Sequence, residues 1–182
     1  MKKTSLIIFI VIVSLLIISI FTMGVIVNTR HHHEFVEVDN EIRQVYINYL
    51  NKQCTFQKYT ATRSQARASL EAEFNFDNYT YKEGKVKNGM GLSIIPIRYI
   101  KVDVAADDME YYYIVLAHEM CHIKYFTTNE IYTQFMAFKG LYESDNDELK
   151  QAGIWLGIYI LNRGYSEDYD CSNLIINYLK EI

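Results

Sequence analysis

Residues Leu6 to Val27 form a predominantly hydrophobic run of 22 residues that carries no charge. As a helix rising about 1.5 Å per residue, such a run is long enough to cross the hydrocarbon core of a bilayer. A cleaved signal peptide, the alternative, would have a shorter apolar core and a small-residue cleavage site, and Phe21 to Asn28 offers only a poor one. The pattern therefore predicts an uncleaved transmembrane anchor.

Basic residues flank this run unequally. Lys2 and Lys3 precede it, whereas one arginine and the weakly basic histidines 31–33 follow it. Because positive charge is retained on the cytoplasmic side, we expect residues 1–5 to be cytoplasmic and the rest of the chain to lie outside the membrane. The opposite orientation is the alternative. The polar segment Asn28 to Asn40 would form a stalk, and its three histidines are interpreted as part of that stalk rather than as catalytic ligands.

The rest of the chain, residues 41–182, is long enough for one domain with its own core but not for two. The net charge of -4 comes from interspersed acidic and basic residues without a basic stripe, so no nucleic-acid partner is expected. Three cysteines without a C-x-x-C pair do not make a disulfide framework. Cys54 and Cys171 would either pair in an extracytoplasmic domain or, like Cys121, be ordinary buried thiols.

Helical spacing of apolar residues returns between Glu41 and about Phe74, which predicts one long helix or two helices broken near Thr60. From Asn75 to Gly91 the chain is rich in Asn, Lys and Gly, and we expect turns or a loose hairpin. Ile94 to Val102 favours one or two β-strands. Pro96 lacks a backbone donor, which argues for an edge strand or a bulge.

Four further helices are expected after these strands. Asp107 and Asp108 can begin the first, since acidic groups stabilise a helix N-terminus, and apolar residues continue from Tyr111 to Phe126. The later patterns predict helices from about residue 127 to 143, over 145–164 and over 170–179. The fold class predicted is α+β, predominantly helical, with a small β element before the helix that contains residues 111–126.

The residues with the clearest chemistry are His118-Glu119-Met120-Cys121-His122, which read H-E-x-x-H. Two histidines four apart lie on the same face of a helix and can direct ring nitrogens at one zinc ion. Glu119, about 100° round the helix, can take a proton from a metal-bound water. Cys121 is turned away from the histidines, which favours packing over ligation. A pair of helix histidines without metal is the plainer alternative.

A catalytic zinc normally has three protein ligands, so a third is needed. We expect Glu130, because a short loop after the motif helix would bring the next helix back along it. In the alternative, Glu130 pairs with Thr127 in a capping box. Glu143, Asp145 and Glu148 are the other carboxylates considered.

Together these residues resemble the gluzincin metallopeptidases, in which H-E-x-x-H is followed by a helix with the sequence N-E-x-x-S-D. Asn129, Glu130 and Thr133 fit that sequence, with Thr for Ser, whereas Gln134 stands where the family has an aspartate that hydrogen-bonds a zinc-ligating histidine. The loop before this sequence is also shorter than is typical. The resemblance covers about 40 residues, from Val102 to Leu141.

The resemblance implies a zincin-like domain in which zinc is bound by His118, His122 and Glu130. Attack by a zinc-bound water that Glu119 activates would hydrolyse a peptide bond of a peptide or protein substrate. It also implies an edge strand that aligns the substrate, for which Ile94 to Asp103 is the candidate. A further donor should stabilise the oxyanion.

Tyr159 and Tyr165 are two possible oxyanion donors, without further support from the sequence. The expected protein is thus a membrane-anchored, zinc-dependent metallopeptidase. A tethered zincin-like domain that binds or regulates without catalysis is the alternative.

Overall fold

The computed structural model describes residues 39–182 except 56–57, 88, 106 and 164–165, and it gives only the helical backbone for residues 166–169. The predicted anchor, Leu6 to Val27, and nearly all of the predicted stalk lie outside the described residues. Among the helices of the described part, none combines the length and the apolar character that a membrane span requires.

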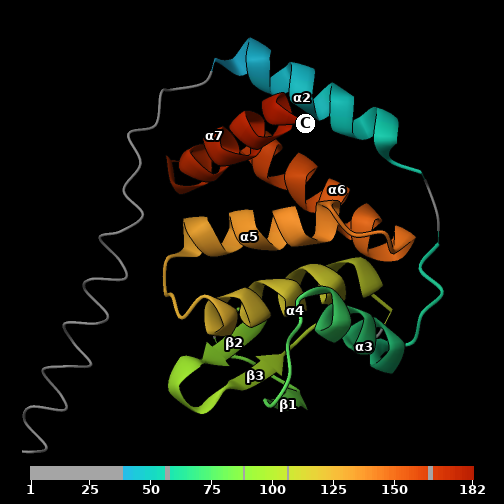
Figure 1. The fold of residues 1–182 in the computed structure, drawn as a ribbon, viewed down its shortest axis with the longest axis vertical. Coiled ribbons are helices and arrows are strands. Elements are labelled where there is room, and N and C mark those ends of the chain that lie inside the picture. The colour runs from blue at the N-terminus through green and yellow to red at the C-terminus, as the bar shows by residue number, and fades with distance from the viewer. Residues whose placement is uncertain (1–38, 56–57, 88, 106, 164–165) are drawn as a thin grey trace, which may run out of the picture. The chain divides into compact units, whose positions relative to one another are not determined.

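Six helices and one small sheet make up the described structure (Figure 1), so the expectation of a predominantly helical α+β fold is confirmed. The elements in chain order are α2 (Asn40–Gln53), α3 (Arg63–Glu73), β1 (Thr80–Glu83), β2 (Gly91–Ile94), η1 (Ile95–Ile97), β3 (Tyr99–Val102), α4 (Met109–Lys124), α5 (Glu130–Tyr142), α6 (Asp147–Arg163) and α7 (Ser166–Glu181).

Two helices, not one, occupy the region from residue 41 to 74. Thr62 begins α3 through a capping box with Gln65, in which each side chain is bonded to the other residue's backbone N–H. On α2 the core-facing residues are Ile47 and Leu50, whereas Val45 is 62% exposed. The helical spacing therefore identified a helix here, although part of its apolar face does not pack into the core.

The sheet has the strand order β1-β3-β2. β1 pairs in parallel with β3, with Thr80 opposite Tyr99, and β2 pairs antiparallel with β3, with Gly91 opposite Val102. The predicted β run, Ile94 to Val102, therefore contains the last residue of β2, the short 3₁₀ turn η1 with Pro96, and the whole of β3. β1 lies in the segment expected to form turns or a loose hairpin, where the pattern of apolar residues is too short to mark a strand.

This order corrects the prediction of an edge strand over Ile94 to Asp103. β3, the strand that leads to the motif helix, is central because β1 and β2 bond to its two sides. β2 is the strand at the edge next to α4. The sequence order of the strands does not reveal this, since the chain places its first strand beside its third.

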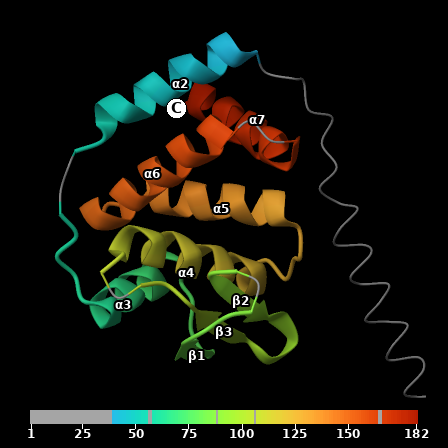
Figure 2. The same ribbon diagram turned by 180° about the vertical axis from the view of Figure 1, so that it is seen from behind.

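α4 is the centre of the described domain. It packs on β2, β3 and α3 on one side and on α5 on the other, and α6, α7 and α2 continue beyond α5 (Figures 1 and 2). α5 and α6 approach closely, because a Cβ at Gly153 would lie only 2.8 Å from the carbonyl carbon of Leu141. Fully buried Leu116 and Met120 of α4 and Phe138 of α5 contribute to this core. The motif helix is thus held on both sides by packed elements.

All three cysteines are free. Cys121 and Cys171 are buried, and half-buried Cys54 accepts a hydrogen bond from the Gln151 amide at 2.9 Å. The disulfide considered between Cys54 and Cys171 is therefore not formed, and the alternative of packed thiols describes two of the three.

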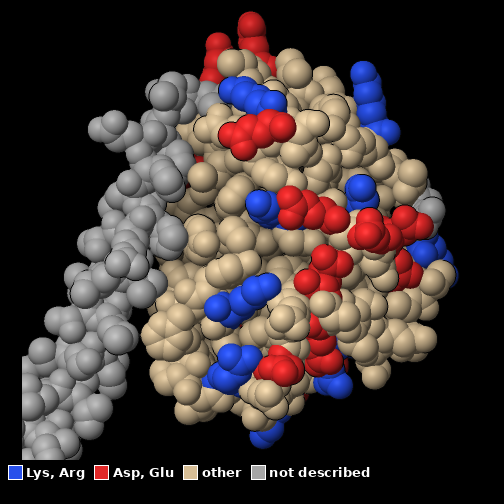
Figure 3. Space-filling view, viewed as in Figure 1, with Lys and Arg blue, Asp and Glu red and all other residues tan. Residues whose placement is uncertain are grey.

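Charged side chains are interspersed over the face shown in Figure 3, where lysines and arginines lie among aspartates and glutamates. Fields from mixed surface charges largely cancel beyond a Debye length of about 10 Å. On this face, local groups of side chains therefore matter more for recognition than a surface potential of one sign.

Candidate metal centre

The histidine pair lies in the C-terminal half of α4, with His122 in its last turn. Asp108 caps the helix by accepting a hydrogen bond from the backbone N–H of Tyr111 at 3.2 Å, so the helix begins where the sequence predicted. His118 and His122 are four positions apart, and their ring centroids are separated by 4.6 Å. Both rings therefore occupy one face of the helix.

The loop after α4 brings the next helix back towards these rings. Phe126 adopts a left-handed conformation with φ of 49°, and Asn129 then caps α5 by accepting from the N–H of Tyr132 at 3.0 Å. Glu130 is consequently the first residue of α5, and the predicted capping box of Thr127 with Glu130 is wrong. The Thr127 hydroxyl instead accepts from the N–H of Asn129, which leaves the Glu130 carboxylate available to the histidines.

Glu130 meets both histidines. Its Oε2 lies 3.0 Å from Nε2 of His118 and its Oε1 lies 3.4 Å from Nε2 of His122, while the two Nε2 atoms are 3.0 Å apart. Ligands of a tetrahedral zinc, at bond lengths of about 2.0–2.2 Å, are separated by roughly 3.3–3.6 Å. The two contacts of Glu130 involve different carboxylate oxygens. With one ligand atom taken from each of the three residues, all of these atoms lie within 4.8 Å of one another, which is close enough for them to hold a metal ion.

The tautomer of His122 is suited to this role. Its Nδ1 donates to the backbone carbonyl of Thr127 at 2.8 Å, and the hydroxyl of Thr133 lies 3.3 Å from the same nitrogen. With Nδ1 protonated, the neutral ring would have its Nε2 lone pair free for a metal ion. In the family that the sequence resembles, an aspartate at the position of Gln134 orients a histidine. Here the loop carbonyl orients His122, and residue types do not reveal such a contact.

Hydrogen bonding between the histidines and Glu130 also shifts their protonation. Hydrogen bonds from His118 and His122 hold the pKa of the Glu130 carboxyl well below its usual range, although this side chain is 69% exposed. Burial disfavours the charged form of His122, but its hydrogen bonds to Glu130 and Thr127 raise its pKa overall. The carboxylate is therefore ionised and available for a cation.

Glu119 lies on the other side of the same helix turn and faces β2. Its side chain is 7% exposed, and burial raises its pKa despite a hydrogen bond from Ser93 and the nearby histidines. Gly91 makes room for it, because a Cβ at that position would lie 2.8 Å from both Cγ and Cδ of Glu119. Glu119 can be recognised in the sequence from its motif, whereas Gly91 and Ser93 cannot, since no local pattern links the edge strand to the motif.

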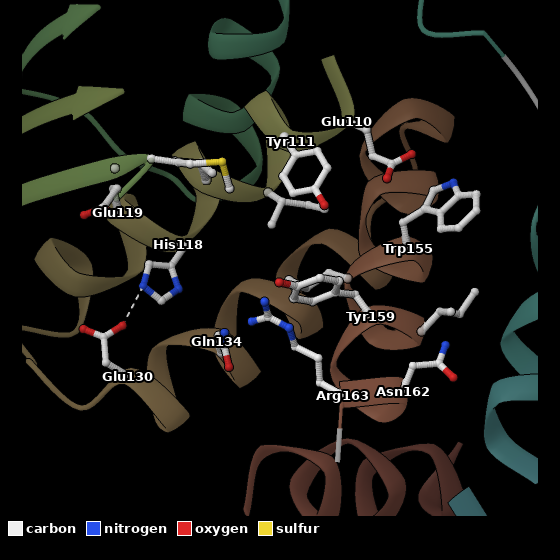
Figure 4. A pocket seen from close by; sticks show the side chains of 16 residues that line it. Glu110, Tyr111, His118, Glu119, Glu130, Gln134, Trp155, Tyr159, Asn162 and Arg163 are labelled. Carbon is white, nitrogen blue, oxygen red and sulfur yellow. Dashed lines mark hydrogen bonds and ion pairs between the residues drawn. The ribbon is translucent and has the colours of Figure 1, made fainter. Parts of the chain in front are cut away.

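His118, Glu119 and Glu130 line a cavity of about 580 Å³ between β2, α4, α5 and α6. Figure 4 shows Tyr159 and Arg163 of α6 pointing into this cavity, facing the side that holds His118 and Glu130. Tyr159, one of the two tyrosines considered as an oxyanion donor, thus lies in the same cavity. The other, Tyr165, is outside the described residues.

The other carboxylates considered as ligands have different partners. Glu143 accepts a hydrogen bond from Tyr178 at 2.7 Å, and Glu148 accepts one from Tyr113 at 2.7 Å. Asp145 is exposed at the end of α5. In the described part of the chain, the cluster of possible metal ligands comprises His118, His122 and Glu130 alone.

Cys121 does not join this cluster, as the sequence suggested. It is fully buried, and burial raises the pKa of its thiol to about 12. A thiol with so high a pKa is rarely ionised near neutral pH, whereas metal ligation needs the thiolate. Packing is therefore its role in this helix.

In comparisons with known proteins, no family model, no curated protein and no solved structure matches the chain.

Proposed function

We propose that this chain is a zinc-dependent metallopeptidase of zincin-like fold. The observation that carries the proposal is the convergence of His118, His122 and Glu130. The two Nε2 atoms are 3.0 Å apart, and each lies within 3.4 Å of one oxygen of the Glu130 carboxylate. A purely structural zinc site is normally closed by four protein ligands. Three ligands beside a cavity, with a buried carboxylate next to them, suit a catalytic site better.

Each residue of the motif has a distinct role in this proposal. His118, His122 and Glu130 would hold the metal. When bound, zinc lowers the pKa of a coordinated water to about 7 and polarises a carbonyl group. Glu119 accepts the proton of the attacking water and passes it to the leaving nitrogen as the peptide bond breaks, which is general acid–base catalysis.

β2 supplies a surface for the substrate backbone in this proposal. It pairs with β3 on one side only, and Gly91, its first residue, lines the cavity. An extended peptide can add to such an edge through main-chain hydrogen bonds. A peptide bound there would pass the histidines and Glu119, which is consistent with hydrolysis of a peptide bond rather than of a smaller compound.

The proposal also includes a membrane anchor at Leu6 to Val27, with the catalytic domain on the extracytoplasmic side. Its support is the uncharged run of 22 residues and the two lysines before it. Extraction of membranes with alkaline carbonate tests it. The full chain should remain in the membrane pellet, and its release into the supernatant would remove the anchor from the proposal.

The decisive experiment compares the full-length protein with its Glu119→Gln variant. Zinc content per chain and cleavage of a mixed peptide pool by mass spectrometry are measured for both. We expect about one zinc in each protein and a loss of cleavage by roughly 10²- to 10⁴-fold in the variant. Glu143→Gln, which removes an acid bonded to Tyr178, is the matched control and should cleave like the wild type.

Two results would decide against this function. Cleavage that survives Glu119→Gln contradicts the assigned base. Zinc binding without any cleavage by the wild type would instead support the alternative of a tethered, non-catalytic zincin-like domain.

A further inference from the structure

One cationic side chain extends into the cavity of the candidate metal centre. Arg163, in the last turn of α6, is the one arginine or lysine among the described residues that line the cavity. It makes no ion pair with a carboxylate of the described residues. Its charge therefore faces space that a ligand can occupy.

The ring of Tyr159 holds this guanidinium in place. The Arg163 Cζ lies 4.5 Å from the ring centroid, and the two side chains extend together into the cavity in Figure 4. Stacking on an aromatic ring leaves the N–H groups at the edge of the guanidinium free to donate. A planar donor fork of this kind matches a carboxylate, to which it can make two parallel hydrogen bonds.

Arg163 is itself exposed to solvent, so a ligand can reach it from outside the cavity. Ile114, Val115 and Leu156 are among the apolar residues that line the rest of the cavity. A hydrogen bond between a guanidinium and a carboxylate is charge-assisted and stronger than one between neutral groups.

Three acidic residues also line the cavity. Glu119 and Glu130 have assigned roles with the histidines, and Glu110 lies beside Trp155, away from Arg163 (Figure 4). The positive charge of Arg163 therefore has no carboxylate partner among the described residues that line the cavity.

We propose that Arg163 binds a carboxylate of the substrate, and that this site therefore prefers anionic peptides. The inference rests on the proposed peptidase function and adds the substrate class to it. The carboxylate comes either from the C-terminus of the peptide or from an acidic side chain, and both sources have the same chemistry at the guanidinium.

Two pairs of peptides distinguish these sources. One pair has the same apolar sequence with a C-terminal carboxylate or carboxamide, and the other is amidated and contains either Glu or Gln near the scissile bond. With the full-length, zinc-loaded protein, we expect kcat/KM to favour the carboxylate member of one pair by about tenfold or more. Arg163→Gln should reduce that ratio to about one, and Arg163→Lys should restore part of it, since lysine keeps the charge without the planar fork.

The matched control is Lys150→Gln, which removes one positive charge from an exposed position on the same helix, outside the cavity. It should leave the ratio unchanged. Equal cleavage of both members of both pairs by the wild type would overturn the proposal. So would a uniform loss of cleavage in Arg163→Gln with the ratio preserved, because Arg163 would then act on the scissile carbonyl or on folding.

A binding measurement separates this proposal from the catalytic one. Calorimetry with the Glu119→Gln protein compares an N-acetylated dipeptide acid with its amide, and the acid should bind about tenfold more tightly only while Arg163 is present. If the acid is preferred but the wild type cleaves nothing, the peptidase function fails and the anion site stands. If the preference survives Arg163→Gln and disappears on chelation of the metal, the carboxylate binds zinc and the proposal about Arg163 is wrong.

Discussion

The glutamates on the two sides of α4 have pKa values that are shifted in opposite directions. On the side that faces the sheet, Glu119 is 7% exposed, and burial against β2 raises its pKa. On the side that faces α5, Glu130 is 69% exposed, and hydrogen bonds from the two histidines lower its pKa. Glu119 is therefore easier to protonate than an ordinary carboxylate, whereas Glu130 is held as an anion.

The residue type is the same, so the position of the neighbouring backbone accounts for the different properties of Glu119 and Glu130. Glu119 is buried beside the edge strand β2, which approaches its side chain closely at Gly91. Glu130 owes its position to Asn129, which caps α5 in place of Thr127. A base benefits from a raised pKa, whereas a metal ligand benefits from a permanent charge.

The largest effect should come from removing the carboxylate on the α5 side. Glu130→Ala deletes one of three ligands, and we expect zinc affinity to fall by at least about 100-fold, since even changes to groups behind the ligands cost about 10–100-fold. Titration of the full-length protein with zinc in a chelator buffer measures this. Glu119→Gln should keep its affinity within about threefold, because Glu119 is placed as the base and not as a ligand.

Glu143→Ala is the control for this change, because Glu143 was a candidate ligand and is bonded to Tyr178 instead. Its zinc affinity should match that of the wild type. A loss of affinity in Glu143→Ala, together with retention in Glu130→Ala, would contradict the ligand set and with it the contrast between the two sides.

A smaller effect is expected on the sheet side from Gly91→Ala. The new Cβ would lie 2.8 Å from Cγ and Cδ of Glu119, so the base must move. Displacement of a catalytic group by about 1 Å lowers rates by up to about 100-fold, and overpacking costs about 1–3 kcal/mol of stability. We expect kcat/KM to fall by 10- to 100-fold while zinc content stays at one per chain.

Gly89→Ala is the matched control, because its Cβ would find an ordinary contact of 3.6 Å with the carbonyl oxygen of Gly91. It should retain nearly all activity. If Gly91→Ala cleaves peptides at the wild-type rate, the close fit between β2 and Glu119 has no part in catalysis.

The smallest effect should come from Glu148, a carboxylate that lies outside the candidate metal centre. Glu148 accepts hydrogen bonds from the N–H of Thr60 at 2.7 Å and from the Tyr113 hydroxyl at 2.7 Å, and it joins α6 to the segment before α3. We expect Glu148→Gln to lower the free energy of unfolding by about 1 kcal/mol, measured by urea denaturation, without a change in zinc content.

The pH dependence of that loss follows from the direction of the Glu148 shift. Burial opposes ionisation of Glu148, but its hydrogen bonds lower its pKa overall. A depressed pKa gives stability that is complete above the unfolded value of about 4.3 and is lost as pH falls through the folded pKa. The difference between wild type and variant should therefore shrink below about pH 4. Asp147→Asn, an exposed change in the same helix turn, should alter stability by less than about 0.5 kcal/mol.

Helix positions were the most predictable part of this fold. Spacing of apolar residues and the Asp108 cap predicted the motif helix close to its observed start, because those signals are local. The prediction was wrong for the cap of α5, where Thr127 and Asn129 are both good capping residues. Which of them caps depends on the hydrogen bonds of Thr127 with its neighbours, and these form only in the folded loop.

Strands and the cavity were less predictable. The sequence indicated a β run. It did not indicate that Gly91 to Ile94 would form an edge strand or that β1 would pair with β3. Arg163 follows an ordinary helical pattern, and its sequence neighbours give no sign that it enters the cavity of residues about 40 positions earlier. Pairing of strands and packing of helices are non-local, so a window of ten or twenty residues contains little of that information.

The sequence by itself determined the predominantly helical fold and the placement of His118, Glu119 and His122 on one helix, because the periodicity of an α-helix fixes which neighbours share a face. Tertiary structure alone decided that Glu130 meets both histidines, that Thr127 orients His122, and that Gly91 and Arg163 border the same cavity. The physical reason is that each of these contacts joins different elements, and their distances are set by how α4 packs between the sheet and α5.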